Sequence, residues 1–139
     1  MAGKKRFTKA QKDYMEKLRD PRWQKKKNGV LERDSYTCTW CRAGLDDGRN
    51  LQVHHGYYAP RSAGMEPWDY PDASLFTLCY DCHEQAESLK QELNVLQGHV
   101  PPQYQHQVFY FMQELLEALA AGEEIVALPP RNPVKGKAA

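Results

Sequence analysis

Two C-x-x-C pairs constrain this chain more than any other feature. Cys38 and Cys41 form the first pair, Cys79 and Cys82 form the second, and the chain has no other cysteine. Four thiolates in two such pairs are the number and type of ligand that close a tetrahedral structural zinc site. We therefore predict one zinc ion held by all four, in a reducing compartment, rather than a disulfide framework. The segment between the pairs, residues 42–78, is longer than in a compact zinc ribbon and must contain structure of its own.

None of the five histidines is needed to close the zinc site, and three of them lie beside the cysteine pairs. His54 and His55 stand between the cysteine pairs, and His83 directly follows the last cysteine. The zinc would bring the three close together. Neutral imidazoles of His54 and His83 could hold a second, divalent cation, while His55, with an ordinary pKa of about 6.5, is suited to accept a proton. Glu87 lies one helical turn after His83 and is a candidate carboxylate ligand. For each histidine taken alone, the alternative is a hydrogen-bonded structural residue.

Charge is divided unevenly along a chain whose formal net charge is only +1. Residues 1–33 carry twelve Lys or Arg against four Asp or Glu, whereas residues 34–139 carry seven against fourteen. A basic arm of this kind favours a polyanionic partner, the alternative being a solvated helical face. No apolar run approaches the roughly 20 residues that span a bilayer, and no hydrophobic signal core follows the N-terminus. We expect a soluble, cytoplasmic protein with no membrane partner.

Local patterns predict an α+β chain. Caps and helical periodicity predict helices, and short alternating runs predict strands. The predicted helices span residues 8–19, 21–33, 83–98 and 103–121, and the predicted strands span residues 51–53 and 75–78. The paired histidines follow the first strand, so the backbone should bend at Gly56 if both are to serve one site.

Two apolar segments have more than one interpretation. The loop of residues 57–74 is rich in aromatic side chains, which favours a packed cover over a small core, with a base-stacking platform as the alternative. The helix at residues 103–121 carries a long apolar stripe. The stripe is most simply core, and the alternatives are a homodimer seam or a docking helix for a larger assembly.

Several runs together resemble one known family. They are Leu51–His55, the loop at Pro67–Trp68, Leu75–His83, Pro21–Trp23 and Leu31–Asp34. In combination they are similar to the HNH endonucleases, most closely to the small zinc-stapled kind of bacteria and phages. The resemblance covers about residues 14–87. It implies a ββα-metal fold, in which two strands and a helix hold one divalent ion.

The resemblance also implies roles for single residues. His54 and His83 would be the metal ligands, and His55 would be the general base that deprotonates the attacking water. The ion would be Mg²⁺ or Mn²⁺, with Ni²⁺ or Zn²⁺ as alternatives, and it would stabilise charge on the phosphate. The family's middle asparagine, which braces the loop that carries the base, is replaced by Ser74.

The predicted organisation follows from these assignments. An HNH nuclease core with a four-cysteine zinc site is flanked by N-terminal and C-terminal helices. The predicted divisions are a basic disordered leader at residues 1–7, the nuclease domain with its basic helices at residues 8–98, a helical extension at residues 99–127, and a disordered tail at residues 128–139.

We expect a metal-dependent endonuclease that hydrolyses phosphodiester bonds in DNA with low sequence specificity, RNA being left open as a substrate. The alternative is a non-catalytic, zinc-stabilised module that binds nucleic acid or docks a protein. The chain would act as a monomer or weak homodimer, or within a larger phage or restriction-type assembly.

Overall fold

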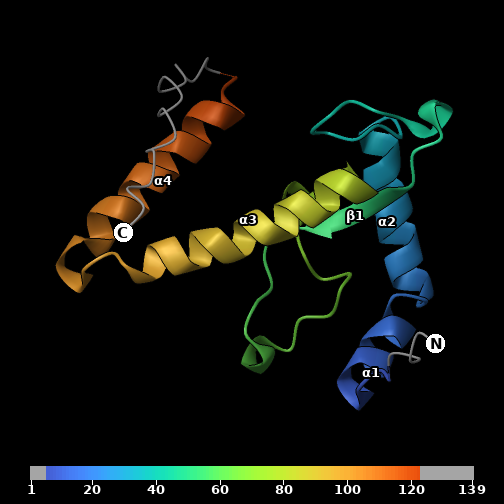
Figure 1. Cartoon of the computed structure of the whole chain (residues 1–139), viewed down its shortest axis with the longest axis horizontal. Coiled ribbons are helices and arrows are strands. Elements are labelled where there is room, and N and C mark those ends of the chain that lie inside the picture. Colours follow the sequence, from blue (N-terminus) through green and yellow to red (C-terminus); the bar gives the residue numbers. More distant parts are fainter. Residues whose placement is uncertain (1–5, 123–139) are drawn as a thin grey trace, which may run out of the picture. The chain divides into compact units, whose positions relative to one another are not determined.

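The computed structural model describes residues 6–122 of the 139 in the chain. Its elements divide into two compact units, one ending at Gln91 and the other beginning at Glu92. Figure 1 shows the ribbon of the chain, coloured by residue number. The first unit contains all eight residues that the sequence singles out as metal ligands, as a candidate ligand or as a base. Most of the predicted leader and the whole predicted tail, residues 128–139, lie outside the described residues.

Two capped helices begin the first unit. Helix α1 spans Lys9–Lys17 and is preceded by Thr8, which forms a capping box with Gln11 as the sequence predicts. Helix α2 spans Pro21–Arg33, and the side chain of its N-cap Asp20 accepts a hydrogen bond from the backbone N–H of Arg22. Both helices are confirmed, because the groups that start them lie within a few residues of the helix ends.

The sheet consists of two antiparallel strands. Strand β1 spans Leu51–His55 and strand β2 spans Leu75–Cys79, so each is longer than predicted. Pairing is regular to the end of β1, with His54 opposite Phe76 and His55 opposite Leu75. The bend that we expected at the histidine pair is therefore absent from the strand. The two histidines consequently face opposite sides of the sheet.

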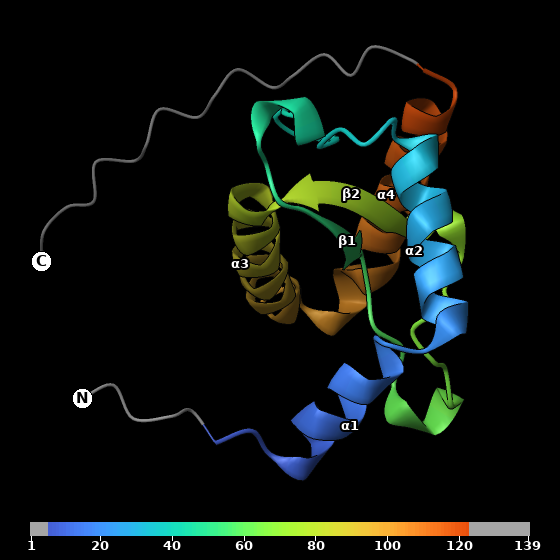
Figure 2. The ribbon, with the colours of Figure 1, turned by 90° about the vertical axis from the view of Figure 1, so that its right-hand side faces the viewer.

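Helix α3 spans Tyr80–Gly98 and follows β2 without a loop. It starts three residues before the predicted start, so the last cysteine and the third histidine both lie in its first turns. The Tyr80 backbone N–H donates to the carbonyl of Asn50, at 3.1 Å, which ties the helix start to the residue before β1. Figure 2 shows the two strands with α3 on one side and α2 on the other.

Two small buried clusters form the core of the first unit. In one, α2 packs on the sheet and on the loop through Trp23, Val30, Tyr70 and Leu75. In the other, three of the cysteines surround Leu78. Because Tyr70 is buried and belongs to the loop of residues 57–74, the prediction that this loop is a packed cover is confirmed. The α+β class is also confirmed, and among the described helices none is long and apolar enough to cross a membrane.

The second unit contains the end of α3 and helix α4, which spans Gln105–Ala120. A single 3₁₀ turn at Pro102–Tyr104 precedes α4, so the helix begins two residues later than predicted. None of its side chains is buried. The expected packing of its apolar stripe into a core is therefore not found among residues 6–122.

Candidate metal centre

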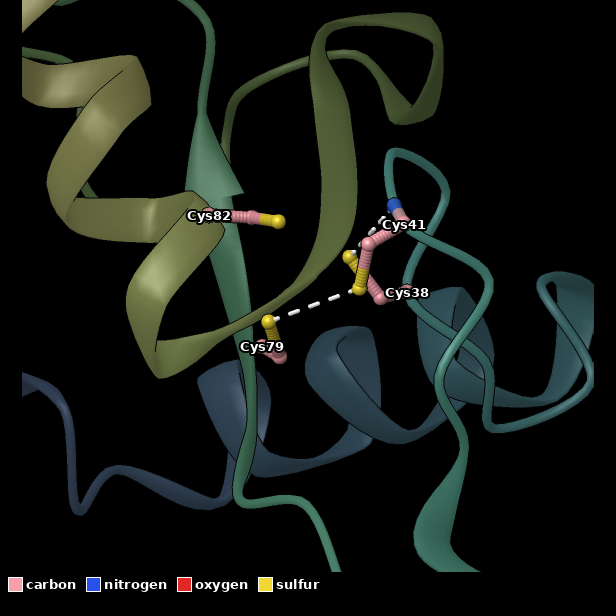
Figure 3. Close-up of side chains that lie close together, drawn as sticks. All are labelled: Cys38, Cys41, Cys79 and Cys82. Carbon is pink, nitrogen blue, oxygen red and sulfur yellow. Dashed lines mark hydrogen bonds between the residues drawn. The ribbon is translucent and has the colours of Figure 1, made fainter. Parts of the chain in front are cut away.

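The four cysteines converge on one point, as predicted. Cys38 and Cys41 come from the turn after α2, Cys79 ends β2 and Cys82 lies in the first turn of α3 (Figure 3). Their sulfur atoms all lie within 4.8 Å of one another, and the sulfurs of Cys41 and Cys79 are 3.8 Å apart. Two sulfurs bound tetrahedrally to zinc at about 2.3 Å should be separated by roughly 3.8 Å. The cluster could therefore hold a structural ion such as zinc.

The surroundings of the thiols suit a bound cation. Burial raises the pKa of Cys38, but backbone N–H groups of Cys41, Cys79 and Trp40 outweigh it and lower the pKa to about 6. Burial raises the pKa of Cys82 to about 12, so that thiol needs a metal ion to lose its proton near neutral pH. The cluster would therefore release at least one proton when it binds zinc.

A second cluster joins His54, His83 and Glu87. One ligand atom from each lies within 4.8 Å of the other two. His54 Nδ1 is 3.2 Å from Glu87 Oε1, and the rings of the two histidines meet edge to face with centroids 5.2 Å apart. The structure thus brings together the two predicted ligands and the carboxylate that the sequence left as a candidate.

His54 Nδ1 shows why this cluster fits a cation. The atom is buried, yet it makes no hydrogen bond, although Glu87 Oε1 lies 3.2 Å away. A buried polar atom without a partner costs about 1–3 kcal/mol. Burial is also the main cause that lowers the pKa of His54, so the imidazole is neutral at pH 7 and can act as a ligand.

His55 lies on the other face of β1, and it is not free. Its ring stacks between Trp23 and Tyr58, with centroids 4.9 and 5.2 Å away, and meets Tyr70 edge to face at 5.1 Å. Only 3% of the residue is exposed. Burial lowers the pKa of His55, which departs from the ordinary value that we expected. Because this environment is built by α2 and the loop, it could not be read from the histidine's neighbours in sequence.

The tautomer of His55 follows from its hydrogen bond. Nε2 lies 3.1 Å from the carbonyl oxygen of Pro67, which can only accept. Nε2 therefore carries the proton, and Nδ1 is the nitrogen able to accept one. Pro67 is buried and belongs to one of the runs that resemble the HNH family.

Ser74 braces the loop through its main chain. Its hydroxyl donates to the carbonyl of Pro71 at 2.8 Å, within its own turn. Its carbonyl oxygen accepts from the backbone N–H of Gly56 at 2.8 Å, directly after the histidine pair. A Cβ atom on Gly56 would sit 3.1 Å from that oxygen, so any side chain there would be crowded and the Ser74 backbone would have to shift by a few tenths of an ångström.

Lys90 was not predicted and lies at the centre of the site. Its ammonium donates to the His55 carbonyl at 3.0 Å and to Glu87 Oε1 at 3.2 Å, and it lies 5.0 Å from the Tyr58 ring. The spacing from Glu87 to Lys90, three residues apart on a helix, is the signal that could have identified it. A cavity of about 500 Å³ adjoins these groups, and His55, His83 and Glu87 contribute to its wall.

The basic arm is partly neutralised within the first unit. Lys17 pairs with Glu66 at 2.7 Å, and Lys26 pairs with Asp72 at 2.8 Å. The guanidinium of Arg22 lies 4.1 Å from the centre of the Trp68 ring. These pairs hold the loop of residues 57–74 against α1 and α2.

Comparisons of the chain with protein-family models, with curated proteins and with solved structures returned no match.

Proposed function

We propose that the chain is a metal-dependent endonuclease of the HNH type that hydrolyses phosphodiester bonds in DNA. One observation carries the proposal: His54, His83 and Glu87 meet at the junction of β1 and α3, and the buried His54 Nδ1 has no hydrogen-bond partner. A zinc site made of four cysteines needs none of these groups. They form a second set of nitrogen and oxygen ligands that suits a divalent cation.

The proposed chemistry divides among three histidines. His54 and His83 would hold the ion, with Glu87 as a third ligand. When bound, the ion would act as a Lewis acid that stabilises the charge developing on the phosphate and the leaving oxygen. His55 would accept the proton of the attacking water at Nδ1, since Nε2 is committed to the carbonyl of Pro67. Its lowered pKa keeps it neutral, and so able to act as a base, at pH 7.

The surface near the site supports a polyanionic substrate. Helices α1 and α2 carry most of the basic residues in the first 33 positions, and Lys27 contributes to the wall of the cavity that contains His55. Binding through phosphates should weaken steeply as salt concentration rises. The sequence carries no recognisable base-recognition motif, and we therefore propose low sequence specificity.

A specific observation favours a second candidate. His55 is almost completely buried by aromatic rings, so it could serve as a core residue that accepts no proton from water. In that case the chain would be a zinc-stabilised module that binds nucleic acid or a protein without cutting. A plasmid-nicking assay separates the two functions.

The test is nicking of supercoiled plasmid by the full chain in Mg²⁺, Mn²⁺ or Ni²⁺. The endonuclease should convert the plasmid to nicked circles, and His83→Ala and His55→Gln should each abolish conversion. His99→Ala is the matched control, because His99 is an exposed histidine whose ring lies 2.8 Å from the carbonyl oxygen of Val95, outside the metal centre. Zinc content and circular dichroism establish that each variant is folded.

The two candidates predict different results in this assay. The binding module shifts the plasmid on a gel without nicking it in any of the three ions. Unchanged cutting by folded His55→Gln would refute the assigned base. Unchanged cutting by folded His83→Ala would refute the metal site.

A further inference from the structure

The second unit carries a broad apolar surface. Around α4, one side is lined by large apolar residues and the other by glutamine, glutamate, histidine and tyrosine. At 100° per residue, the large apolar residues span an arc of roughly 160°, whereas a helix on the surface of a globular protein needs an apolar stripe only about 100° wide. Seven of them are at least 36% exposed, namely Val108, Phe109, Phe111, Met112, Leu115, Leu116 and Leu119.

The last turns of α3 carry two further exposed apolar residues, Leu93 and Leu96, at 62% and 66%. At roughly half exposure, the seven large side chains of α4 alone present about 600 Å² of apolar area, near the lower end of what each partner buries in a stable interface. An area of this size is at the upper end of the apolar patches found on monomeric proteins.

Charge limits what can cover the surface. Between Glu92 and Gly122 the chain has no lysine or arginine, and its acidic residues are Glu92, Glu114 and Glu117. An acidic, apolar helix pair does not attract nucleic acid or an anionic lipid surface. The chemistry fits a partner that is itself apolar and carries no excess of negative charge opposite the glutamates.

We propose that this partner is a second copy of the chain, with two α4 helices packed antiparallel about a two-fold axis. Val108, Met112, Leu115 and Leu119 follow one another at intervals of four, three and four residues, the spacing of a helix–helix seam. This series reads the same in both directions. An antiparallel pair therefore places Val108 against the partner's Leu119 and Met112 against the partner's Leu115, as an isologous interface requires.

The charges of α4 do not oppose this register. Glu114 and Glu117 lie on the polar side of α4, away from the seam, so the antiparallel pair places no carboxylate in the interface. The interface positions match themselves under a two-fold axis, as packing against a second copy requires.

The test is the mass of the full chain in solution, by sedimentation equilibrium over a range of micromolar concentrations. The wild type should have twice the 16.0 kDa of one chain. Met112→Lys and Leu115→Glu should each have the monomer mass, because each places an unpaired charge in the seam. Gln107→Glu, which adds a charge on the polar side of α4, should remain dimeric.

The two seam variants also test the register. Mixed in equal amounts, Met112→Lys and Leu115→Glu should recover the dimer mass, since the new lysine of one chain lies opposite the new glutamate of the other. A monomeric wild type would overturn the proposal, whether the surface is covered by another protein or by the first unit of the same chain. The proposed dimer would also be refuted if Met112→Lys remained dimeric or if the mixture of the two variants stayed monomeric. Open-ended oligomers of the wild type would refute the two-fold interface. Zinc content and circular dichroism identify folded variants.

Discussion

Asp34 joins α2 to β2, and its removal gives a calculable loss of stability. Its carboxylate accepts from the backbone N–H of Thr77 at 3.2 Å and twice from the guanidinium of Arg33 at 2.8 Å. Arg33 in turn donates to the carbonyls of Asp72 and Leu75, both at 2.7 Å. The end of α2 is thereby fixed to the strand that leads into the zinc cluster.

Asp34→Ala should lower the free energy of unfolding by about 2–3 kcal/mol. Thr77 is 0% exposed, so water cannot replace the lost acceptor, and an unsatisfied buried N–H costs about 1–3 kcal/mol. The side chain of Arg33 is 40% exposed, and losing its screened ion pair adds at most about 1 kcal/mol. Asp34→Asn keeps an oxygen for Thr77 and should cost about 1 kcal/mol or less.

Urea unfolding of the zinc-loaded chain measures these differences. Asp72→Ala is the matched control, because its carboxylate is 70% exposed, pairs with Lys26, and should contribute less than about 0.5 kcal/mol. Equal costs for Asp34→Ala and Asp72→Ala would refute the reasoning.

The pH dependence gives a second check on Asp34. The hydrogen bond from Arg33 is the main cause that lowers its pKa below the ordinary value of 3.8. A carboxyl group whose folded pKa is lowered stabilises the fold fully above its unfolded pKa, and the contribution is lost as the pH falls below it. The difference between the wild type and Asp34→Ala should therefore stay constant from roughly pH 8 to pH 5. A difference that shrinks within this range would show that the carboxylate is not held as described.

Three other perturbations have defined outcomes. Removal of zinc by a chelator, or Cys79→Ser, should unfold the first unit, as followed by circular dichroism and metal analysis; full retention of structure by the zinc-free chain would contradict a structural ion. Gly56→Ala should lower the free energy of unfolding in urea by about 1–3 kcal/mol, because the new methyl group would crowd the Ser74 carbonyl 3.1 Å away. Gly29→Ala, at an open position of α2, is the control and should not destabilise the chain. Equal losses in the two variants would contradict the close approach at Gly56. Burial lowers the pKa of His55, so the unfolded chain binds more protons than the folded chain, and the free energy of unfolding should fall as the pH drops below about 6.5. His55→Gln should reduce this dependence of stability on pH. An unchanged dependence would contradict the burial of His55.

Features fixed by neighbouring residues could be predicted from the sequence. The starts of α1 and α2 depend on caps at Thr8 and Asp20, which are recognisable within one turn of each helix. The four cysteines were also predictable, because two C-x-x-C pairs leave few other ways to satisfy a zinc ion. In both cases the chemistry acts over a short distance or through a metal with strict requirements.

Features fixed by distant residues were missed. The start of α3 was placed too late because Tyr80 and the cysteine knuckle show no apolar periodicity, although the helix runs through them. The environment of His55 depends on Trp23, which lies 32 positions earlier in the sequence, and no local pattern reports that contact. The stripe of α4 correctly indicates an apolar face, but periodicity alone does not say what covers it.

The regular pairing of β1 has a consequence for how such a chain can change length. His54 and His55 are chemically identical, and only the phase of the strand gives one to the metal cluster and the other to the aromatic cage. Adding one residue within β1 before His54 would turn each histidine to the opposite face of the sheet, whereas adding two would return each to its original face. Insertions or deletions before Leu51, in the turn that follows the first cysteine pair, do not change the face to which either histidine points. Sequences that descend from a common ancestor with this chain should therefore vary freely in that turn and change within the strand only by even steps.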